Sequence, residues 1–363
     1  MPALADRLAT RTLELVDIAS ESGHEAAIRE HLLGLVPHAL RPVARGDEAY
    51  LFVPEPRGDA QLVILAGHYD TVPAQGNLPG RIEDGAVHGL GASDMKGGLA
   101  VALELVRDLS DATPGTYDVG LVLFGREELP IEHDPLPALL ESAADELERS
   151  ALAILLEPTD GRVQLGCLGN VVARLTFHGT SGHSARPWLA DNAIARAVEG
   201  LAPLLALPTR DADVGGLTFT EVLSVTRLEA GIADNVVPGE AVATVNLRYP
   251  PDRSPSDAES LLASLVPEGA SLALVGNAPP GRVVSDSPAL HALRAAGALE
   301  LEAKQAWTNV ADFSARGIDA VNFGPGHTRY AHRVDELVEV PALVHAYETL
   351  RRFLEAPIRE DAG

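Results

Sequence analysis

The stretch from Gln61 to Pro73, QLVILAGHYDTVP, begins as a run of apolar residues and ends with two ionisable side chains, His68 and Asp70. A run that is apolar at nearly every position is typical of a strand covered by helices on both faces. Burying an unpaired charge costs free energy. The two polar residues therefore either mark the end of the strand or hold a ligand at its carboxyl end.

Similar apolar runs recur along the chain and alternate with amphipathic helical patterns. YDVGLVLFG (117–125), LAILLEP (152–158) and AVNFGP (320–325) read as further buried strands, and a helical pattern follows GLGASDMKGG (89–98). Strands that alternate with helices are typical of a parallel sheet with helices on both faces. The sequence therefore predicts an α/β fold with a doubly wound, mostly parallel sheet.

The middle of the chain has a different order of elements. From about Asn170 the patterns read strand, helix, strand, strand, helix, strand, and the Pro/Gly-rich GNAPPGRVV (276–284) follows as a linker. The order β-α-β-β-α-β is that of a ferredoxin-like domain. We therefore expect an inserted domain at 170–282 and a discontinuous first domain made of 1–169 and 283–363.

Composition excludes several classes of function. The 363 residues include 28 Lys and Arg against 52 Asp and Glu, a net charge of −24. Such a charge repels nucleic acid and anionic membranes, so we expect neither as a partner. The single cysteine, Cys167, excludes an internal disulfide and fits a reducing compartment. With no signal-peptide pattern and no apolar run of roughly 18 residues, we expect a cytoplasmic protein.

Further ionisable residues stand where the predicted strands end or where a helix begins. Ligand sites of open α/β sheets gather at the carboxyl ends of the strands. Residues that are far apart in the sequence would therefore meet at one edge of the sheet. The candidates are His68, Asp94, Glu127, Glu128, Glu157 and His332.

Each candidate also has a simpler explanation. A histidine after a strand is commonly a hydrogen-bonded loop residue, and Asp94 could cap the helix that follows it. Glu127 and Glu128 could be a solvated pair, and His332 in HRVDE could lie on an exposed loop. These explanations weaken when the residues are considered together, because each group ends a hydrophobic run and none belongs to a charge-rich stretch.

As a set, the candidates have the chemistry of a two-metal hydrolase site. Zinc accepts histidine nitrogen and carboxylate oxygen, and catalytic sites leave a position for water. Two metals about 3.5–4 Å apart need a bridging carboxylate. One histidine and one glutamate per metal, with a shared aspartate, leave one glutamate as a general base. Asp70 shares a strand face with His68, so we expect it to orient the histidine ring.

Six motifs, in this order, make the chain resemble the co-catalytic zinc aminoacylase/carboxypeptidase family of metallopeptidases over nearly its whole length. They are GHYDTVP, GLGASDMKGG, REE, LLEPT, GTSGHSARP and AHRVDE. The resemblance implies two Zn²⁺ per chain, with Co²⁺ as a substitute. It also implies a cis peptide bond between Asp94 and Met95.

The resemblance also implies a role for each candidate. His68 and Glu157 would bind one zinc, and Glu128 and His332 would bind the other. Asp94 would bridge the two metals. Glu127 would be the general base, and Asp70 would support His68.

The same resemblance implies functional roles for three residues of the inserted domain. His183 in GHSARP corresponds to a family histidine that reaches the scissile carbonyl from a partner subunit, which implies a homodimer formed through the inserted domain. Arg248 in NLRY and Asn235 in DNVVP correspond to substrate-binding positions. Their simpler explanations are a surface arginine and a turn asparagine.

For the substrate, the resemblance implies a small N-acyl amino acid. HSARPWLADNAI, GCLGN, WTNVADF and VNFGPG favour the branch that removes succinate from N-succinyl-L,L-2,6-diaminopimelate in lysine and diaminopimelate biosynthesis. Arg126 departs from that branch, in which small or polar residues precede the paired glutamates. The alternatives are an acetylornithine deacetylase, a dipeptidase-like relative, and a metal-stabilised binding protein without turnover.

Overall fold

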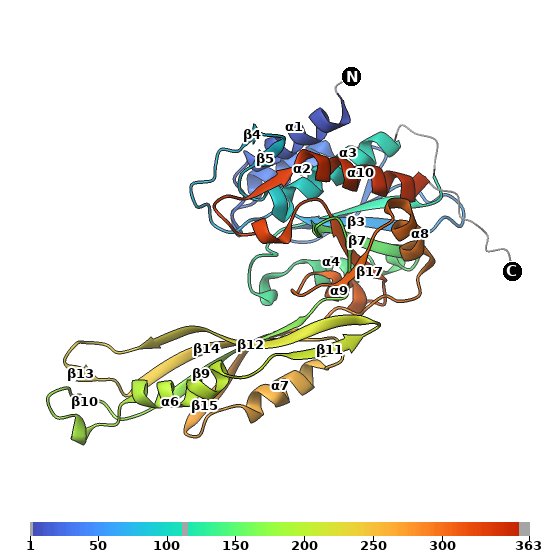
Figure 1. Cartoon of the computed structure of the whole chain (residues 1–363). Helices are drawn as coiled ribbons and strands as arrows, with labels where there is room; N and C mark the ends of the chain where they lie inside the picture. The colour runs from blue at the N-terminus through green and yellow to red at the C-terminus, as the bar shows by residue number, and fades with distance from the viewer. Residues whose placement is uncertain (1–2, 111–114, 356–363) are drawn as a thin grey trace. The chain divides into compact units, whose positions relative to one another are not determined.

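The computed structural model describes residues 3–110 and 115–355 and separates the chain into two compact units (Figure 1). The first unit contains Met1–Leu165, Val284–Glu302 and Asp312–Gly363, and the second contains Gly166–Val283 and Ala303–Ala311. The inserted domain expected at 170–282 does not include the segment 303–311. In the second unit this segment is tied down by hydrogen bonds, since Trp307 Nε1 donates to the Pro279 carbonyl (3.1 Å) and Leu168 N donates to the Ala306 carbonyl (3.2 Å).

The first unit is built on an eight-stranded sheet with the order β1-β2-β6-β3-β7-β17-β8-β16. Its four central strands are parallel, and β2 and β8 pair antiparallel on the two flanks. The strands are β1 (Arg41–Arg45), β2 (Ala49–Val53), β3 (Leu62–His68), β6 (Asp118–Phe124), β7 (Ser150–Pro158), β8 (Val163–Leu165), β16 (Leu301–Ala303) and β17 (Ala320–Gly324).

Helices cover this sheet, and every residue of β3 is buried. α3 lies against β3, β6 and β7 and packs with α1 and α10, while α4 lies against β1 and β2. The helices are α1 (Leu4–Val16), α2 (Ala26–Leu35), α3 (Gly97–Ser110), α4 (Leu136–Ser142), α5 (Ala144–Leu147), α8 (Pro288–Gly297), α9 (Val310–Ala315) and α10 (Val340–Glu355). The predicted α/β class and mostly parallel centre are confirmed. None of the described helices is long and apolar enough to cross a membrane.

Short elements complete the first unit near the ends of its central strands. A small sheet has the order β18-β5-β4. Asp94 lies in η1, a short helical turn, and its peptide bond to Met95 is cis, as the resemblance implies. These elements are β4 (Arg81–Glu83), β5 (Ala86–His88), β18 (Leu337–Glu339), η1 (Ala92–Lys96), η2 (Ile131–His133) and η4 (Thr328–Tyr330).

The second unit contains the predicted β-α-β-β-α-β order as β9, α6, β12, β14, α7 and β15. Its sheet has the order β11-β12-β14-β9-β15, so the additional strand β11 occupies one edge. The short strands β10 and β13 pair with each other. The elements are β9 (Gly169–His178), β10 (Gly182–His183), η3 (Pro187–Leu189), α6 (Ala193–Leu205), β11 (Arg210–Val214), β12 (Leu217–Ala230), β13 (Val236–Val237), β14 (Glu240–Tyr249), α7 (Pro255–Ser264) and β15 (Ala270–Ala278).

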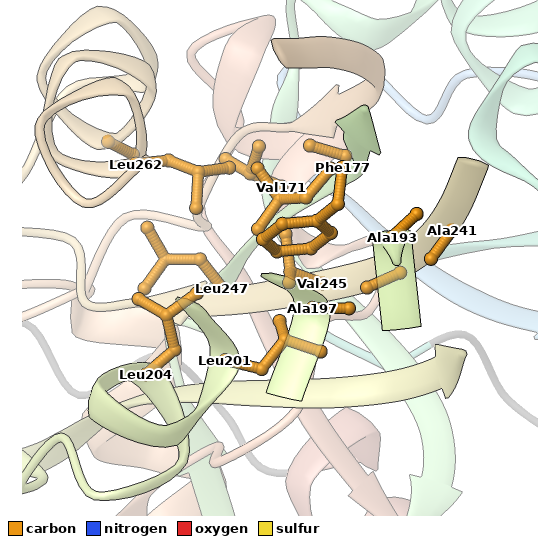
Figure 2. Packing of buried hydrophobic residues seen from close by; sticks show 14 of the residues in the cluster. Val171, Phe177, Ala193, Ala197, Leu201, Leu204, Ala241, Val245, Leu247 and Leu262 are labelled. Carbon is orange, nitrogen blue, oxygen red and sulfur yellow. The ribbon is translucent and has the colours of Figure 1, made fainter. Parts of the chain in front are cut away.

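The core of the second unit follows the periods of its elements. Alternate residues of β9 and β14 face α6 and α7, and α6 contributes small and branched residues three or four positions apart (Figure 2). The buried cluster includes Val171, Phe177, Ala197, Leu201, Val245, Leu247 and Leu262. The Asn192 side chain accepts a hydrogen bond from Ile194 N (2.9 Å) at the start of α6, and Ser254 forms a capping box with Asp257 at the start of α7. This unit therefore has a hydrophobic core of its own.

Candidate metal centre

Parallel pairing brings the candidate residues of the first unit to one edge of its sheet. His68 is the last residue of β3, the paired glutamates follow the end of β6, and Glu157 lies near the end of β7. These three strands are neighbours in the order β6-β3-β7, so their carboxyl ends meet. Asp94 is brought to the same place by η1, and His332 by the loop after η4.

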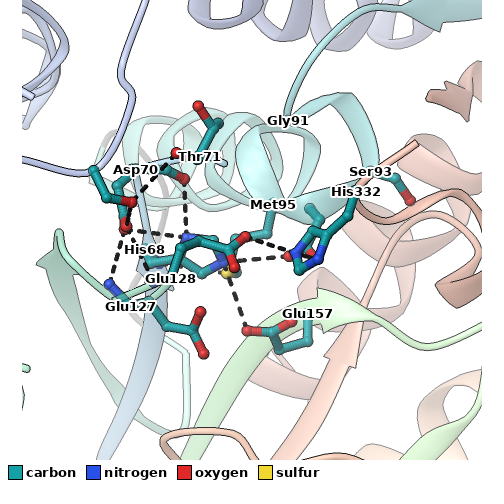
Figure 3. Close-up of polar contacts among 12 residues, drawn as sticks. His68, Asp70, Thr71, Gly91, Ser93, Met95, Glu127, Glu128, Glu157 and His332 are labelled. Atoms are coloured by element: carbon teal, nitrogen blue, oxygen red, sulfur yellow. Dashed lines mark hydrogen bonds and ion pairs between the residues drawn. The ribbon is translucent and has the colours of Figure 1, made fainter. Parts of the chain in front are cut away.

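The donor atoms of these residues lie within a few ångströms of one another. Asp94 Oδ1 is 3.2 Å from His68 Nε2, and Asp94 Oδ2 is 3.5 Å from His332 Nε2. His68 Nε2 is also 3.9 Å from Glu157 Oε1, and His332 Nε2 is 2.8 Å from Glu128 Oε1. Figure 3 shows the side chains of His68, Glu128, Glu157 and His332 gathered in one place. The two oxygens of Asp94 therefore face two different histidines, each with its own glutamate.

The donor set fits divalent metal ions. His68, Asp94 and Glu128 each offer a ligand atom, and these atoms lie within 4.8 Å of one another. Imidazole nitrogen and carboxylate oxygen are ligands that zinc accepts. A carboxylate that presents one oxygen to each of two histidines has the shape that two adjacent metals require of a bridge.

Asp70 lies beneath the paired glutamates and is completely buried. Its Oδ1 accepts a hydrogen bond from Glu127 N (3.1 Å) and its Oδ2 accepts from Glu128 N (3.2 Å) and Ser22 Oγ (2.6 Å). His68 Nδ1 lies 3.4 Å from Asp70 Oδ1. Burial alone would raise the pKa of Asp70, but its bonds with His68, Ser22 and Glu128 hold it below the usual range. Asp70 therefore stays ionised and fixes both the histidine and the backbone of the glutamate pair.

The titratable groups of the centre perturb one another strongly. Removal from water raises the pKa of Glu127 well above its usual range, and the charges of Glu157, Glu128 and Asp94 raise it further against the opposing effect of His68. The hydrogen bond with Glu128 raises the pKa of His332 to about 9, although burial opposes it. Glu127 is thus a carboxylate with high proton affinity inside a cluster of negative charge, a property shared by many catalytic bases.

His68 has a raised pKa for a related reason. Burial lowers the proton affinity of its ring, but the hydrogen bonds with Asp70 and Asp94 and the charge of Glu127 outweigh that effect. The carboxylates of the centre therefore attract positive charge onto both histidine rings. A divalent cation placed between these groups would satisfy the same attraction.

Arg126 does not belong to this cluster of donors. Its residue adopts a positive φ of 63°, and its Nη1 donates a hydrogen bond to Asp47 Oδ2 at 2.8 Å. Arg126, the residue that departs from the pattern expected before the paired glutamates, therefore pairs with the exposed carboxylate of Asp47.

The candidates of the second unit divide into two places. His183 is exposed in β10, which pairs with β13, and the Asn235 carbonyl accepts a hydrogen bond from Ser184 N (3.0 Å). Arg248 lies in β14, eight residues beyond Glu240, where that strand begins. Eight residues of a strand span roughly 27 Å. The structure therefore brings Asn235 next to the His183 segment and places Arg248 near the other end of β14.

Sequence reasoning missed one buried carboxylate at the centre. Glu336 accepts hydrogen bonds from the backbone N–H groups of Gly91, Ser93 and Asp94. Burial raises its pKa to about 7, although these three N–H groups oppose the rise. In the sequence, the role of Glu336 is indicated by nothing more than its position four residues after His332. Its neighbour Asp335 is also a carboxylate, and in the structure that side chain is exposed.

The comparison with known proteins agrees with this geometry. The model of peptidase family M20/M25/M40 matches residues 64–356. A succinyl-diaminopimelate desuccinylase of Corynebacterium glutamicum is 35% identical over 94% of this chain and 95% of its own length. A protein of Mycobacterium tuberculosis, provisionally named as the same enzyme, is 39% identical over 94% of this chain and 96% of its own.

Solved structures share the fold at low sequence identity. The aminopeptidase PepT of Bacillus cereus aligns with a TM-score of 0.76 at 18% identity, over 97% of this chain and 98% of that chain. A dinuclear metal-binding peptidase of the M20 family from Bacillus subtilis aligns with a TM-score of 0.62 at 16% identity, over 97% of this chain and 98% of that chain. From the family match and the full-length relatives together, the chain belongs to peptidase family M20/M25/M40.

Proposed function

We propose that this protein is a two-zinc amide hydrolase that cleaves N-succinyl-L,L-2,6-diaminopimelate into succinate and L,L-diaminopimelate, in the cytoplasm, for lysine and diaminopimelate biosynthesis. The observation that carries the hydrolytic part is the position of Asp94, whose two oxygens face His68 and His332 beside Glu127. The substrate part is supported by the full-length relatives of C. glutamicum and M. tuberculosis.

In this proposal, His68 and Glu157 would hold one zinc, Glu128 and His332 would hold the other, and Asp94 would be a ligand of both. Two bound metal ions would lower the pKa of a water molecule and polarise the amide carbonyl. Co²⁺ could replace zinc, because the ligand set of nitrogen and oxygen donors suits both ions. Five side chains are thereby used as ligands, and Glu127 is left without a ligand role.

Glu127 acts as the proton carrier. Its carboxylate takes a proton from the attacking water, whose oxygen forms a bond to the amide carbon. When the carbon–nitrogen bond breaks, Glu127 delivers the proton to the leaving amine. The raised pKa of Glu127 suits both halves of this transfer. Asp70 holds the Glu127 and Glu128 N–H groups and orients His68, so it fixes the base relative to the metal ligands.

His183, Asn235 and Arg248 are the proposed contacts of the second unit with the substrate. We place His183 opposite the oxygen of the scissile carbonyl, where an N–H donor stabilises developing negative charge. Arg248 would hold a substrate carboxylate through its planar guanidinium, and Asn235 would bind polar groups of the substrate. Because His183 and Arg248 lie far apart on one chain, we assign them to one active site from two subunits of a C₂ homodimer.

The substrate assignment is tested by amine release from a panel of amides. Protein dialysed against a chelator is expected to be inactive, and about two zinc ions per chain should restore cleavage. Succinyl-diaminopimelate should have a higher kcat/KM than acetylornithine or any dipeptide of the panel. A higher kcat/KM for acetylornithine or a dipeptide would show that the assigned substrate is wrong. Full activity in protein shown by elemental analysis to be metal-free would exclude a metal-dependent hydrolase.

Replacing Glu127 and Glu128 one at a time by alanine should affect kcat and zinc content differently. Glu127→Ala is expected to keep both zinc ions and lower kcat by about 10²–10⁴, the usual contribution of a general base. Glu128→Ala should lose a zinc, because it removes a ligand. Kinetics and metal content of both variants form a matched pair, since the two residues are adjacent. If Glu128→Ala keeps its metals and Glu127→Ala loses one, the two roles are reversed.

A mixture of two inactive variants tests the shared active site. His183→Ala and Glu127→Ala are each expected to be nearly inactive with normal zinc content. A heterodimer of the two would contain one site in which both residues are intact, so part of the activity should return after subunit exchange. Mass spectrometry of labelled subunits verifies the exchange. A mixed dimer as inactive as its parents would contradict the contribution of His183 from the partner.

A further inference from the structure

Glu336 is a buried carboxylate that is neither one of the proposed metal ligands nor the proposed general base. It is 2% exposed and lies four residues after His332. Its Oε2 accepts a hydrogen bond from Gly91 N (2.9 Å), and its Oε1 accepts from Ser93 N (3.0 Å) and Asp94 N (3.0 Å). Its backbone carbonyl accepts another from Gly89 N (3.0 Å). Glu336 therefore binds the segment that carries Asp94 at four points.

The shape of the Asp94 segment explains how these N–H groups converge. Gly91 has a φ of 78°, and a Cβ at this position would come within 2.9 Å of Thr71 Cγ2 and 3.1 Å of Lys96 Cδ. Successive backbone N–H groups that converge in such a turn form a concave site for an anion. Here the anion is the side chain of Glu336, and the charge of Lys96, itself buried, is close enough to interact with it.

Glu336 is thereby connected to both sides of the second proposed metal position. Through Asp94 N it holds the residue whose Oδ2 faces His332 Nε2 at 3.5 Å, and through its own chain it anchors the segment of His332. His68 and Glu157 are held instead by the hydrogen-bonded strands β3 and β7. The position between Asp94, Glu128 and His332 therefore depends on Glu336 more than the position between His68 and Glu157 does.

We propose that Glu336 is a positioning residue that sets the separation of Asp94 and His332 and so determines the affinity of the metal held between them. This inference rests on the proposed two-metal function. Residues that orient metal ligands typically contribute 10–100-fold to metal affinity or activity. Both oxygens of Glu336 act as acceptors, which a neutral amide cannot reproduce because its NH₂ group would face a backbone N–H donor.

The test compares Glu336→Gln with Asp335→Asn at pH 8. Asp335 is the matched control, because it is the adjacent carboxylate, is exposed and pairs with Arg333. Zinc is titrated into metal-free protein in competition with a chelator, and folding is followed by circular dichroism. For Glu336→Gln we expect one of the two zinc affinities to fall 10–100-fold and the other to change less than threefold. The control should keep both affinities, and kcat should fall in Glu336→Gln with little change in KM.

A conservative variant separates positioning from folding. Glu336→Asp keeps the charge and both acceptor oxygens but is one methylene shorter, so the zinc affinity that falls in Glu336→Gln should take a value between wild type and Glu336→Gln in this variant. If Glu336→Gln does not fold, the test uses Glu336→Asp, in which one zinc affinity should again fall more than the other. Wild-type affinities at both positions, or equal losses at both, would overturn the proposal.

The metal titration does not depend on turnover. A wild-type protein that binds two zinc ions but cleaves none of the substrates contradicts the proposed hydrolysis, and the selective loss in Glu336→Gln still supports the role of Glu336. A wild-type protein without affinity for zinc overturns both.

Discussion

The position of the Asp94 carboxylate between His68 and His332 is the constraint on which the rest of the centre depends. Its two oxygens lie 3.2 and 3.5 Å from the two imidazole nitrogens. Asp94 faces both rings from a segment of its own, η1, which packs against β3 and β7. The parallel pairing of these strands supplies the other groups, because each strand ends at the same edge of the sheet. The fold of the first unit thus assembles the centre from segments that are more than 250 residues apart in sequence.

The same arrangement concentrates negative charge in a partly buried place. Glu127 and His68 have pKa values well above their usual ranges, and that of His332 is raised to about 9. Removal from water is the largest cause of the rise for Glu127, whereas neighbouring carboxylates raise the pKa of both imidazoles against the effect of burial. Backbone N–H groups donate the hydrogen bonds to the Glu336 carboxylate, and the two backbone N–H groups of the glutamate pair donate to Asp70, which His68 also stabilises.

Much of this fold could be predicted because it rests on local patterns. The apolar runs that became β3, β7 and β17 are visible in the sequence, as are the alternating residues of β9 and β14 that face the core of the second unit. The candidates at strand ends follow from the same patterns and a general property of α/β sheets. By contrast, β11 and the short pair β10 and β13 have little hydrophobic periodicity, and the cis bond after Asp94 was implied by the resemblance alone.

Contacts to the backbone could not be foreseen for a different reason. Glu336 accepts hydrogen bonds from the N–H groups of Gly91, Ser93 and Asp94, and Asp70 accepts them from the glutamate pair. These bonds join segments distant in sequence through N–H groups that every residue except proline carries. Such bonds leave no residue pattern. The most direct measurement of the central claim is anomalous scattering at the zinc edge from crystals of zinc-loaded protein. Two peaks about 3.5–4 Å apart are expected, one on each side of the Asp94 carboxylate, and a single peak or a metal held without Asp94 would contradict the two-metal centre.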